Sequence, residues 1–321
     1  MAIPSIALIP SGYKTSKLYS VLPTDGTGDF TFTRAGQKTR VDKNNNIETL
    51  SVNLPPLDYT GGGCPVLLIE PVQTQIYGET DTMATQTKTV AAVEHTVGFY
   101  GTGTVTFTGV YSGTLVGTGA NNRVELTFTP TAGDLISTVS GTVLKSQLVT
   151  GAYLGSYIIN SGTNTVSRVS DKIPSGADSS LINSEEGVLF AEIAALSDDG
   201  TNRFLSINDT TSTNRIVLSF LSSNEINCRL KNSTDQCNLS SSVDIKNYNK
   251  IAFKWKVNDF ALWVNGVEVE TDTSGITFNA DTLNNVSFDS GTGSANMFCK
   301  LKKLYVYKSA LTDSELETLT I

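Results

Sequence analysis

The fold of this chain is decided by residues 251–270, which read IAFKWKVNDFALWVNGVEVE. Apolar side chains recur at every second position over residues 251–257, and the same alternation returns over residues 260–264. A period of two is that of a β-strand with one face in a hydrophobic core. Asn265-Gly266 then supplies the residues of a type I′ turn, whose two central positions need a positive φ. The stretch predicts two antiparallel strands and a hairpin that returns over residues 267–270 with its acids toward solvent.

The composition of the 321 residues extends this pattern to the whole chain. Charged residues make up only 17%, and 27 residues are glycine. Threonine, which is frequent throughout, fits a pleated and half-buried surface, while glycine and asparagine suit tight turns. Long runs at helical spacing are almost absent, so we expect an all-β, multidomain protein.

One short helix is predicted at the end of the chain. Thr312 is a good N-cap, and Glu315 completes a capping box three residues later. Leu311 and Leu316 stand at the two positions of a hydrophobic staple. These signals agree on a helix that begins just after Thr312.

Charge and hydropathy argue against two classes of partner. The formal net charge is −8 and the basic residues are scattered, so we expect no nucleic-acid partner. No run of 18 apolar residues occurs, so we expect no membrane insertion. The first five residues, MAIPS, lack the charged and apolar segments of a secretory signal, which favours a protein made in the cytoplasm.

The four cysteines are Cys64, Cys228, Cys237 and Cys299. They form no Cys-x-x-Cys pair and the chain has one histidine, which argues against a structural zinc site. Cys228 and Cys237 could face each other across a hairpin and form a disulfide. Buried free thiols are the alternative, favoured by a reducing cytosol.

Three regions follow one another along the chain. Residues 1–80 hold short strand-like pieces between turns and bury little alone, so we expect an attachment segment that packs on a partner or a neighbouring subunit. Residues 81–160 have strands about every 10 residues with glycine-rich turns, typical of a small sandwich or jelly roll. Residues 170–321 form the clearest domain.

The last region resembles the laminin-G/concanavalin A-like sandwich family. The resemblance rests on the hairpin at 251–269 and on residues 303–316, KLYVYKSALTDSEL, where a last strand runs into a short helix. It covers roughly residues 175–321 and implies a lectin-like fold.

The upstream part is similar to bacteriophage virion proteins of the tail or fibre kind. The similarity rests on DFTFTR (29–34), TRVD (39–42), LPPLDY (54–59) and CPVLLIEP (64–71). Such proteins often continue with a β domain like a carbohydrate-binding module, which matches the middle region.

This second resemblance implies a tail- or head-fibre component of the virion, docked on other virion proteins and binding host-surface polysaccharide. It also implies a homotrimer, since threefold association covers exposed strand edges. A decoration protein without a ligand and a polysaccharide depolymerase are the alternatives.

Catalytic signals are weak. His95 is the only histidine, so a Ser-His-Asp or Cys-His nucleophile has to use it, and no nucleophile motif stands near. Paired carboxylates can cleave glycosides without histidine, but the sandwich glycosidases carry acids that alternate along one strand. Here Glu268 and Glu270 alternate on the strand face that is expected to point to solvent, and exposure to solvent is a sufficient reason for charged residues there. We expect no enzymatic activity.

Glycan binding needs aromatic faces for sugar rings, flanked by Asp, Asn or Arg for the hydroxyls. Trp255 lies on the apolar face and is expected in the core. Trp263 alternates opposite to its apolar neighbours, and an exposed Trp often marks a contact surface. The candidate glycan-binding residues are Trp263, Asp198 and Asn202, with packing against a sheet or subunit as the alternative for Trp263.

The resemblance to laminin-G-like domains also implies a calcium ion at the rim of the sandwich. Hard oxygen ligands stand in two loops, as Asp198 and Asp199 in the first and Asp209 in the second. Plain Asp-Gly turn chemistry is the alternative for these aspartates. Calcium is therefore the one expected cofactor.

Overall fold

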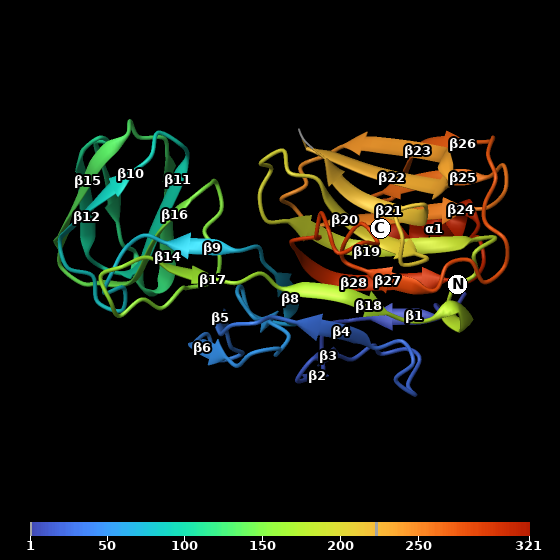
Figure 1. Cartoon of the computed structure of the whole chain (residues 1–321), viewed down its shortest axis with the longest axis horizontal. Coiled ribbons are helices and arrows are strands. Elements are labelled where there is room, and N and C mark those ends of the chain that lie inside the picture. The colour runs from blue at the N-terminus through green and yellow to red at the C-terminus, as the bar shows by residue number, and fades with distance from the viewer. Residues whose placement is uncertain (1, 222–223) are drawn as a thin grey trace. The chain divides into compact units, whose positions relative to one another are not determined.

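A computed structural model describes residues 2–221 and 224–321, and the chain divides into two compact units. Unit 1 is built from Met1–Arg34, Val52–Glu70 and Asp171–Ile321, and unit 2 from Ala35–Ser51 and Pro71–Ser170. Strands form nearly all of the regular structure in the described residues, apart from one α-helix and one 3-10 turn (Figure 1). The predicted all-β class is confirmed.

Unit 1 contains three sheets. An eight-stranded sheet runs β26-β25-β24-β19-β28-β8-β7 with β1 also paired to β28, a five-stranded sheet runs β23-β22-β21-β20-β27, and a smaller sheet runs β18-β4-β3-β2. The elements of unit 1 are β1 (Ile6–Leu8), β2 (Tyr13–Lys14), β3 (Lys17–Leu18), β4 (Phe30–Thr33), β7 (Leu57–Asp58), β8 (Val66–Ile69), β18 (Lys172–Gly176), η1 (Ser179–Leu181), β19 (Gly187–Ala195), β20 (Arg203–Asn208), β21 (Asn214–Leu221), β22 (Glu225–Asn232), β23 (Thr234–Ser242), β24 (Asn249–Trp255), β25 (Phe260–Val264), β26 (Val267–Asp272), β27 (Asn285–Ser287), β28 (Cys299–Tyr307) and α1 (Asp313–Thr320).

The hairpin that opened the sequence analysis forms as predicted. β24 and β25 are antiparallel, with Ile251 opposite Val264, and β26 returns from the turn. Asn265 and Gly266 have φ angles of 51° and 83°, as a type I′ turn requires. The apolar residues of these strands lie in the core, where Phe253 and Trp255 are fully buried.

The core of unit 1 lies between its two large sheets. It joins the inward side chains of β19, β24 and β28 to those of β20, β21 and β22 in one cluster. A second, smaller cluster covers the opposite face of the eight-stranded sheet beneath α1. The capping box that was predicted for this helix is present, with the Glu315 N–H donating to Thr312 Oγ1 and the Thr312 N–H donating to Glu315 Oε2.

The structure divides the chain differently from the predicted regions 1–80, 81–160 and 170–321. Residues of the expected attachment segment complete the sheets of unit 1, because β1 and β8 both pair with β28 and β4 pairs with β18. Residues 35–51 and 71–80 belong instead to unit 2. The short strands of the N-terminal region therefore bury their apolar faces on their own chain.

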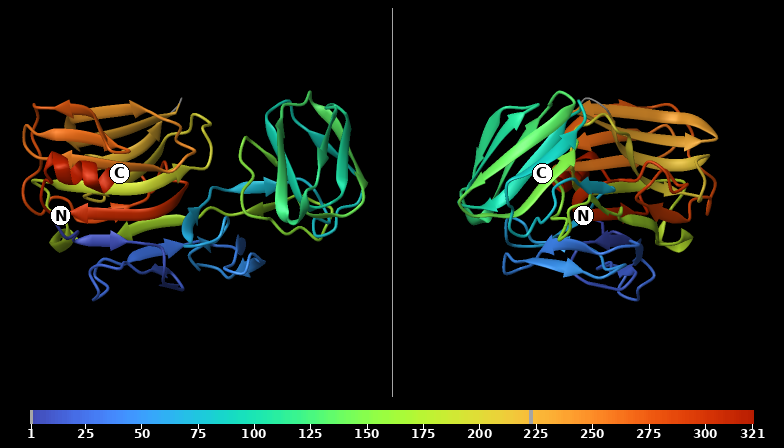
Figure 2. Two further views of the ribbon diagram at one scale, coloured as in Figure 1. Left: turned by 180° about the vertical axis from the view of Figure 1, so that it is seen from behind. Right: turned by 60° about the vertical axis from the view of Figure 1, so that its left-hand side comes forward.

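Unit 2 is the small sandwich expected for the middle region. Its sheets run β10-β15-β12-β13 and β14-β11-β16, with two further hairpins, β5-β6 and β9-β17. The two sheets lie face to face (Figure 2), and both contribute to one core, which includes Phe99 and Phe107. The elements of unit 2 are β5 (Lys38–Val41), β6 (Ile47–Leu50), β9 (Gln73–Gln75), β10 (Gln86–Val90), β11 (His95–Gly101), β12 (Thr104–Gly109), β13 (Gly113–Val116), β14 (Gly119–Phe128), β15 (Gly133–Ser140), β16 (Val143–Thr150) and β17 (Val166–Arg168).

The cysteines are free thiols in the structure. Cys228, Cys237 and Cys299 are buried, and Cys64 is exposed. Burial raises the pKa of the Cys237 thiol to about 12 and raises that of Cys228 as well, so both stay protonated at neutral pH. In the described residues no helix is long and apolar enough to cross a membrane.

A buried ion pair joins the three segments of unit 1. The Arg34 guanidinium lies 3.1 Å from Asp171 Oδ1, and both side chains are fully buried. Arg34 Nη1 also donates to the Leu54 carbonyl, and the Glu70 N–H donates to Asp171 Oδ2. The ends of all three segments thus meet at one pair of charges.

We predict that Asp171→Asn lowers the free energy of unfolding of unit 1 by about 3–5 kcal/mol, because it removes a negative charge that is paired with the buried Arg34 guanidinium. Both tryptophans of the chain, Trp255 and Trp263, lie in unit 1, so denaturant unfolding followed by tryptophan fluorescence reports on this unit. Lys256→Gln is the control, because its pair with Glu186 is half exposed and is worth about 1 kcal/mol or less. Equal effects of the two variants would contradict the prediction.

Candidate functional site

The five-stranded sheet of unit 1 has one face in the core and one face turned away from it. In β21 the inward residues are Ile216, Leu218 and Phe220, which belong to the core cluster. The alternating residues Arg215 and Ser219 therefore point to the other side. We call this side the outer face and define it by Phe204, Ser206, Asn208, Arg215, Val217, Ser219, Asn227, Arg229, Lys231, Asn238 and Ser240.

The strand register aligns these residues in rows across the sheet. One row places Asn238 beside Arg229 and Arg229 beside Val217. A second row places Asn227 between Ser240 and Ser219. Polar side chains from four separate strands, β20, β21, β22 and β23, are thereby brought to one surface.

Arg215 lies flat on the outer face. Its guanidinium is 5.8 Å from the ring centroid of Phe204, and its Nη1 donates to the carbonyl oxygen of Ser290. The residue is only 9% exposed, and its Nε has no hydrogen-bond partner among the described residues. Burial, followed by repulsion from Arg229, lowers the pKa of Arg215.

Arg229 is the second guanidinium of the outer face. Its Nη1 is 3.6 Å from Asp235 Oδ2, with exposed side-chain fractions of 27% and 53%. Its Nε is buried and, within the described chain, also lacks a hydrogen-bond partner. This long contact to a solvated carboxylate leaves Arg229 able to bind a further acceptor.

Neutral polar groups surround the two guanidiniums. Asn227 Nδ2 donates to Asn238 Oδ1 at 2.8 Å, and Ser219 Oγ donates to the Asn227 carbonyl at 3.1 Å. Asn238 itself is exposed. Amide and guanidinium groups in such an array can donate to, and accept from, the hydroxyls of a sugar.

A buried polar network supports one side of the outer face. Asn208 Nδ2 donates to the hydroxyls of Ser206 and Ser287 at 2.8 and 3.0 Å. Ser206 Oγ donates to the carbonyl of Asp289, and Asp289 Oδ1 accepts from Ser287 Oγ. This network fixes the loop that carries Ser290, the residue to which Arg215 is bound.

Trp263, the predicted sugar-stacking residue, lies elsewhere. It is 7% exposed and packs beneath α1 in the cluster that includes Leu311 and Leu316. The alternative of a packing role is what the structure shows, because the C-terminal helix covers the face on which Trp263 stands. The indole is therefore not presented to a ligand in this conformation.

The aspartates of the predicted calcium site do not come together. Asp199 is bound by the Arg203 guanidinium at 2.6 Å, and Asp198 Oδ1 accepts from the Asn224 N–H. Asp209 Oδ1 accepts a hydrogen bond from the Thr211 N–H within the same turn, and Asn202 is exposed. Across residues 2–221 and 224–321, no three metal-ligating side chains gather in one place. The calcium ion stays a prediction, which titration of the full chain with calcium chloride would test.

Three side chains were considered for catalysis: His95, Glu268 and Glu270. His95 is 1% exposed, its Nδ1 is 2.7 Å from the Val93 carbonyl, and its ring stacks near Phe128. Glu268 is exposed, and Glu270 accepts a hydrogen bond from the Ser240 N–H. His95 and Glu270 thus each have a backbone hydrogen-bond partner.

Sequence reasoning did not identify Arg215 and Arg229. A local signal was available, because Arg215 precedes an alternating run of apolar residues in β21 and Arg229 interrupts another in β22. The signal marks both as outward-facing, but only the register shows that they are diagonal to each other, with Arg215 opposite Lys231 and Arg229 opposite Val217.

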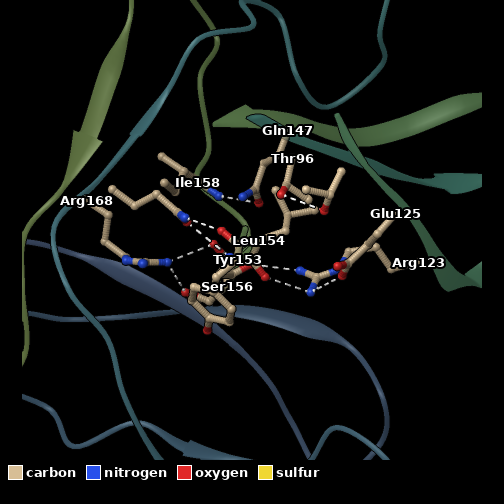
Figure 3. Close-up of polar contacts among 12 residues, drawn as sticks. Thr96, Arg123, Glu125, Gln147, Tyr153, Leu154, Ser156, Ile158 and Arg168 are labelled. Atoms are coloured by element: carbon tan, nitrogen blue, oxygen red, sulfur yellow. Dashed lines mark hydrogen bonds and ion pairs between the residues drawn. The ribbon is translucent and has the colours of Figure 1, made fainter. Parts of the chain in front are cut away.

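Unit 2 contains a cleft of about 250 Å³. It is lined by residues 36–39, Thr49, 157–159 and 166–169, which mix aliphatic and polar side chains. Side chains fix the adjoining loop: Arg123 donates to the Leu154 carbonyl, Arg168 donates to the Ser156 carbonyl, and Gln147 Oε1 accepts from the Ile158 N–H (Figure 3). The cleft therefore has one wall of fixed backbone.

Comparison with known proteins identifies the C-terminal part of the chain. Residues 189–317 match the family model described as the concanavalin A-like lectin/glucanases superfamily. This part of unit 1 is thus a concanavalin A-like lectin domain, as the resemblance implied. No curated protein matches the sequence.

Several solved structures are similar at low identity. The IT-sialidase CBM40 of Ruminococcus gnavus with bound α2,3-sialyllactose is 20% identical with a TM-score of 0.37, over 43% of this chain and 83% of that chain. The leech intramolecular trans-sialidase is 19% identical with a TM-score of 0.37, over 43% of this chain and 23% of that chain. The NanB sialidase of Streptococcus pneumoniae is 13% identical with a TM-score of 0.37, over 44% and 24%. Likenesses at this level carry no conclusion about ligand or reaction.

The ion pair between Asp199 and Arg203 predicts that the stability of unit 1 depends on pH. Partial burial opposes ionisation of Asp199, but hydrogen bonds from Arg203, Thr201 and Ser197 outweigh it and lower the pKa from 3.8 to about 2. Because the folded-state pKa is the lower one, the stabilisation is complete above the unfolded pKa and is lost as pH falls through about 2.

We therefore expect the unfolding midpoints of the wild type and of Asp199→Asn to differ at pH 6 and to converge below pH 4. Urea unfolding followed by tryptophan fluorescence at each pH measures the difference. A difference that stays constant down to pH 2 would rule out this contribution of the ion pair.

Proposed function

We propose that this chain is a structural protein of a bacteriophage virion, a fibre or appendage component whose C-terminal lectin domain binds host-surface glycans. The observation that carries the binding proposal is the outer face of the five-stranded sheet. There, side chains from β20 to β23 combine guanidinium and amide groups on a domain that matches a lectin family model.

The chemistry of the outer face suits a sugar. A sugar ring presents several hydroxyls, each of which can donate and accept, so a binding surface needs several polar groups held in fixed positions. Asn227 is fixed by its bond to Asn238, and Arg215 by its bond to Ser290. The partly buried ring of Phe204 adds an apolar surface beside them.

The proposal of a virion appendage is supported by the resemblance of residues 29–34, 39–42, 54–59 and 64–71 to phage fibre-type proteins. Under this proposal the protein is located in the virion, docks on other virion proteins and forms a homotrimer. We also propose that the chain is not an enzyme, since its one histidine, His95, is buried and its Nδ1 contacts the Val93 carbonyl.

Glycan binding is tested with Asn238→Ala in the full chain. Asn238 is exposed on the outer face, and loss of one neutral hydrogen bond is expected to weaken binding about three- to tenfold. Asn202→Ala is the matched control, because Asn202 is equally an exposed asparagine of unit 1 but lies off the outer face. Glycan-array binding followed by affinity measurement on the best ligand gives both values.

Two results would contradict this proposal. If no host polysaccharide binds, a decoration protein without a ligand is favoured instead. If the chain releases reducing ends from host capsule, it is a depolymerase. A loss with Asn202→Ala and none with Asn238→Ala would place the site in the loop of Asp198 and Asp199.

The virion location is tested on purified phage particles. We expect an antibody against this chain to label the particles, and light scattering of the isolated protein to give the mass of a trimer. Absence from washed particles would refute the virion role, and a stable monomer would refute the trimer.

A further inference from the structure

We propose that copies of this chain associate through two different surfaces of unit 1, so that the edge strand β26 of one protomer docks on β28 of the next. The inference rests on the homotrimer of the proposed function and names the surfaces that close it. A contact between two unlike surfaces is heterologous, and such contacts can close into rings such as a trimer. The partner is therefore a second copy of this chain.

A basic surface lies on the side of the eight-stranded sheet that faces away from the core. Lys302 Nζ and Lys303 Nζ lie 3.2 and 3.1 Å from the two carboxylate oxygens of Glu192. Lys300, on the same strand β28, is exposed and alternates with Leu301 of the core cluster. Residues 300–303 thus carry three ammonium groups, of which two are paired with the same carboxylate, so an excess of positive charge remains. We define the basic surface by these three lysines.

The geometry of the basic surface is fixed by the sheet. The pairing of β28 with β19 shifts in register between Glu192 and Ile193, and this bulge lets both Lys302 and Lys303 reach Glu192. Lys302 Nζ is also 3.9 Å from the ring centroid of Tyr248, a cation–π contact. The side chains of Lys302 and Lys303 are each 41% exposed, so their ammonium groups stay accessible to an acidic partner.

An acidic edge lies on the same sheet, separated from β28 by β25, β24 and β19 (Figure 1). β26 is the last strand of the order, and residues 267–271 are all exposed. Glu268 is opposite Trp263 in the register, so it lies on the side that α1 covers. There α1 adds the exposed carboxylates of Asp313 and Glu317. We define the acidic edge by Glu268, Asp313 and Glu317.

The strand that carries the acidic edge also presents apolar side chains. Val267 is 58% exposed and Val269 is 37% exposed. Exposed apolar residues on an edge strand favour association with another chain. The basic surface offers a matching apolar area, because the half-buried rings of Tyr248 and Tyr305 lie on its side of the sheet.

Charge decides which surface covers β26. The chain has a formal net charge of −8, so most contacts between two copies are repulsive. Two β26 strands would also repel each other, because each brings Glu268 and Glu270 to the contact. The basic surface is complementary to the acidic edge, and opposite charges across an interface favour this pairing and fix its register.

The test is a charge swap in the full chain, with the mass followed by light scattering over a dilution series. Lys300→Glu and Glu268→Lys each place like charges at the contact, and we expect each to weaken association at least about tenfold. The double variant restores opposite charges, so it should associate more strongly than either single variant. Both side chains are exposed, and the unfolding midpoint of each variant confirms that it is folded.

Lys14→Glu is the matched control, because it makes the same change of charge at an exposed position of β2, in the smaller sheet of unit 1. A trimer that neither single variant weakens would overturn the inference and leave the trimer in place. A double variant that associates no better than the single ones would overturn the pairing of these two surfaces. A wild type that is a stable monomer would refute the trimer and the inference together, whereas glycan binding is measured separately on the array.

Discussion

The buried ion pair between Arg34 and Asp171 determines how unit 1 is assembled. Arg34 is the last residue of the first segment, and Asp171 is the first residue of the third. The carbonyl of Glu70, at the end of the second segment, accepts a hydrogen bond from the Asp171 N–H, and the Glu70 N–H donates to the Asp171 carboxylate. Because two unpaired charges at this depth would be strongly unfavourable, the three segments are stable only when all of them are in place.

This assembly supports the lectin domain indirectly. β28 pairs with β19 on one side and with β1 and β8, from the first two segments, on the other. Those segments cover an edge that a domain starting at residue 170 would leave exposed. The five-stranded sheet packs against the sheet they complete, so the outer face is held on a rigid two-layer support.

Features that depend on local sequence could be predicted. The alternation over residues 251–257, the Asn265-Gly266 turn and the capping box of Thr312 each involve residues close together in the chain, and each is confirmed. The division into units could not be predicted, because it depends on pairings such as Ile6 with Val306, which lie at opposite ends of the sequence. The sequence of a short strand does not indicate which other strand it pairs with.

The candidate site was missed for the same physical reason. Alternation places Trp263 on the face away from the core, but only the packing of α1 shows that this face is covered. Arg215 and Arg229 lie in β21 and β22, outside the hairpin that was recognised. Which residues of β22 lie opposite those of β21 is a property of register, which sequence periodicity alone does not fix.

The outer face thus joins a lectin fold, a rigid support and a pair of guanidiniums that together suit a glycan. The most direct test is a crystal structure of the full chain bound to the glycan that ranks first in solution. We expect the glycan on the outer face, with its hydroxyls near Asn238 and Arg229. A ligand found in the loop of Asp198 and Asp199, or in the cleft of unit 2, would contradict the assignment of the site.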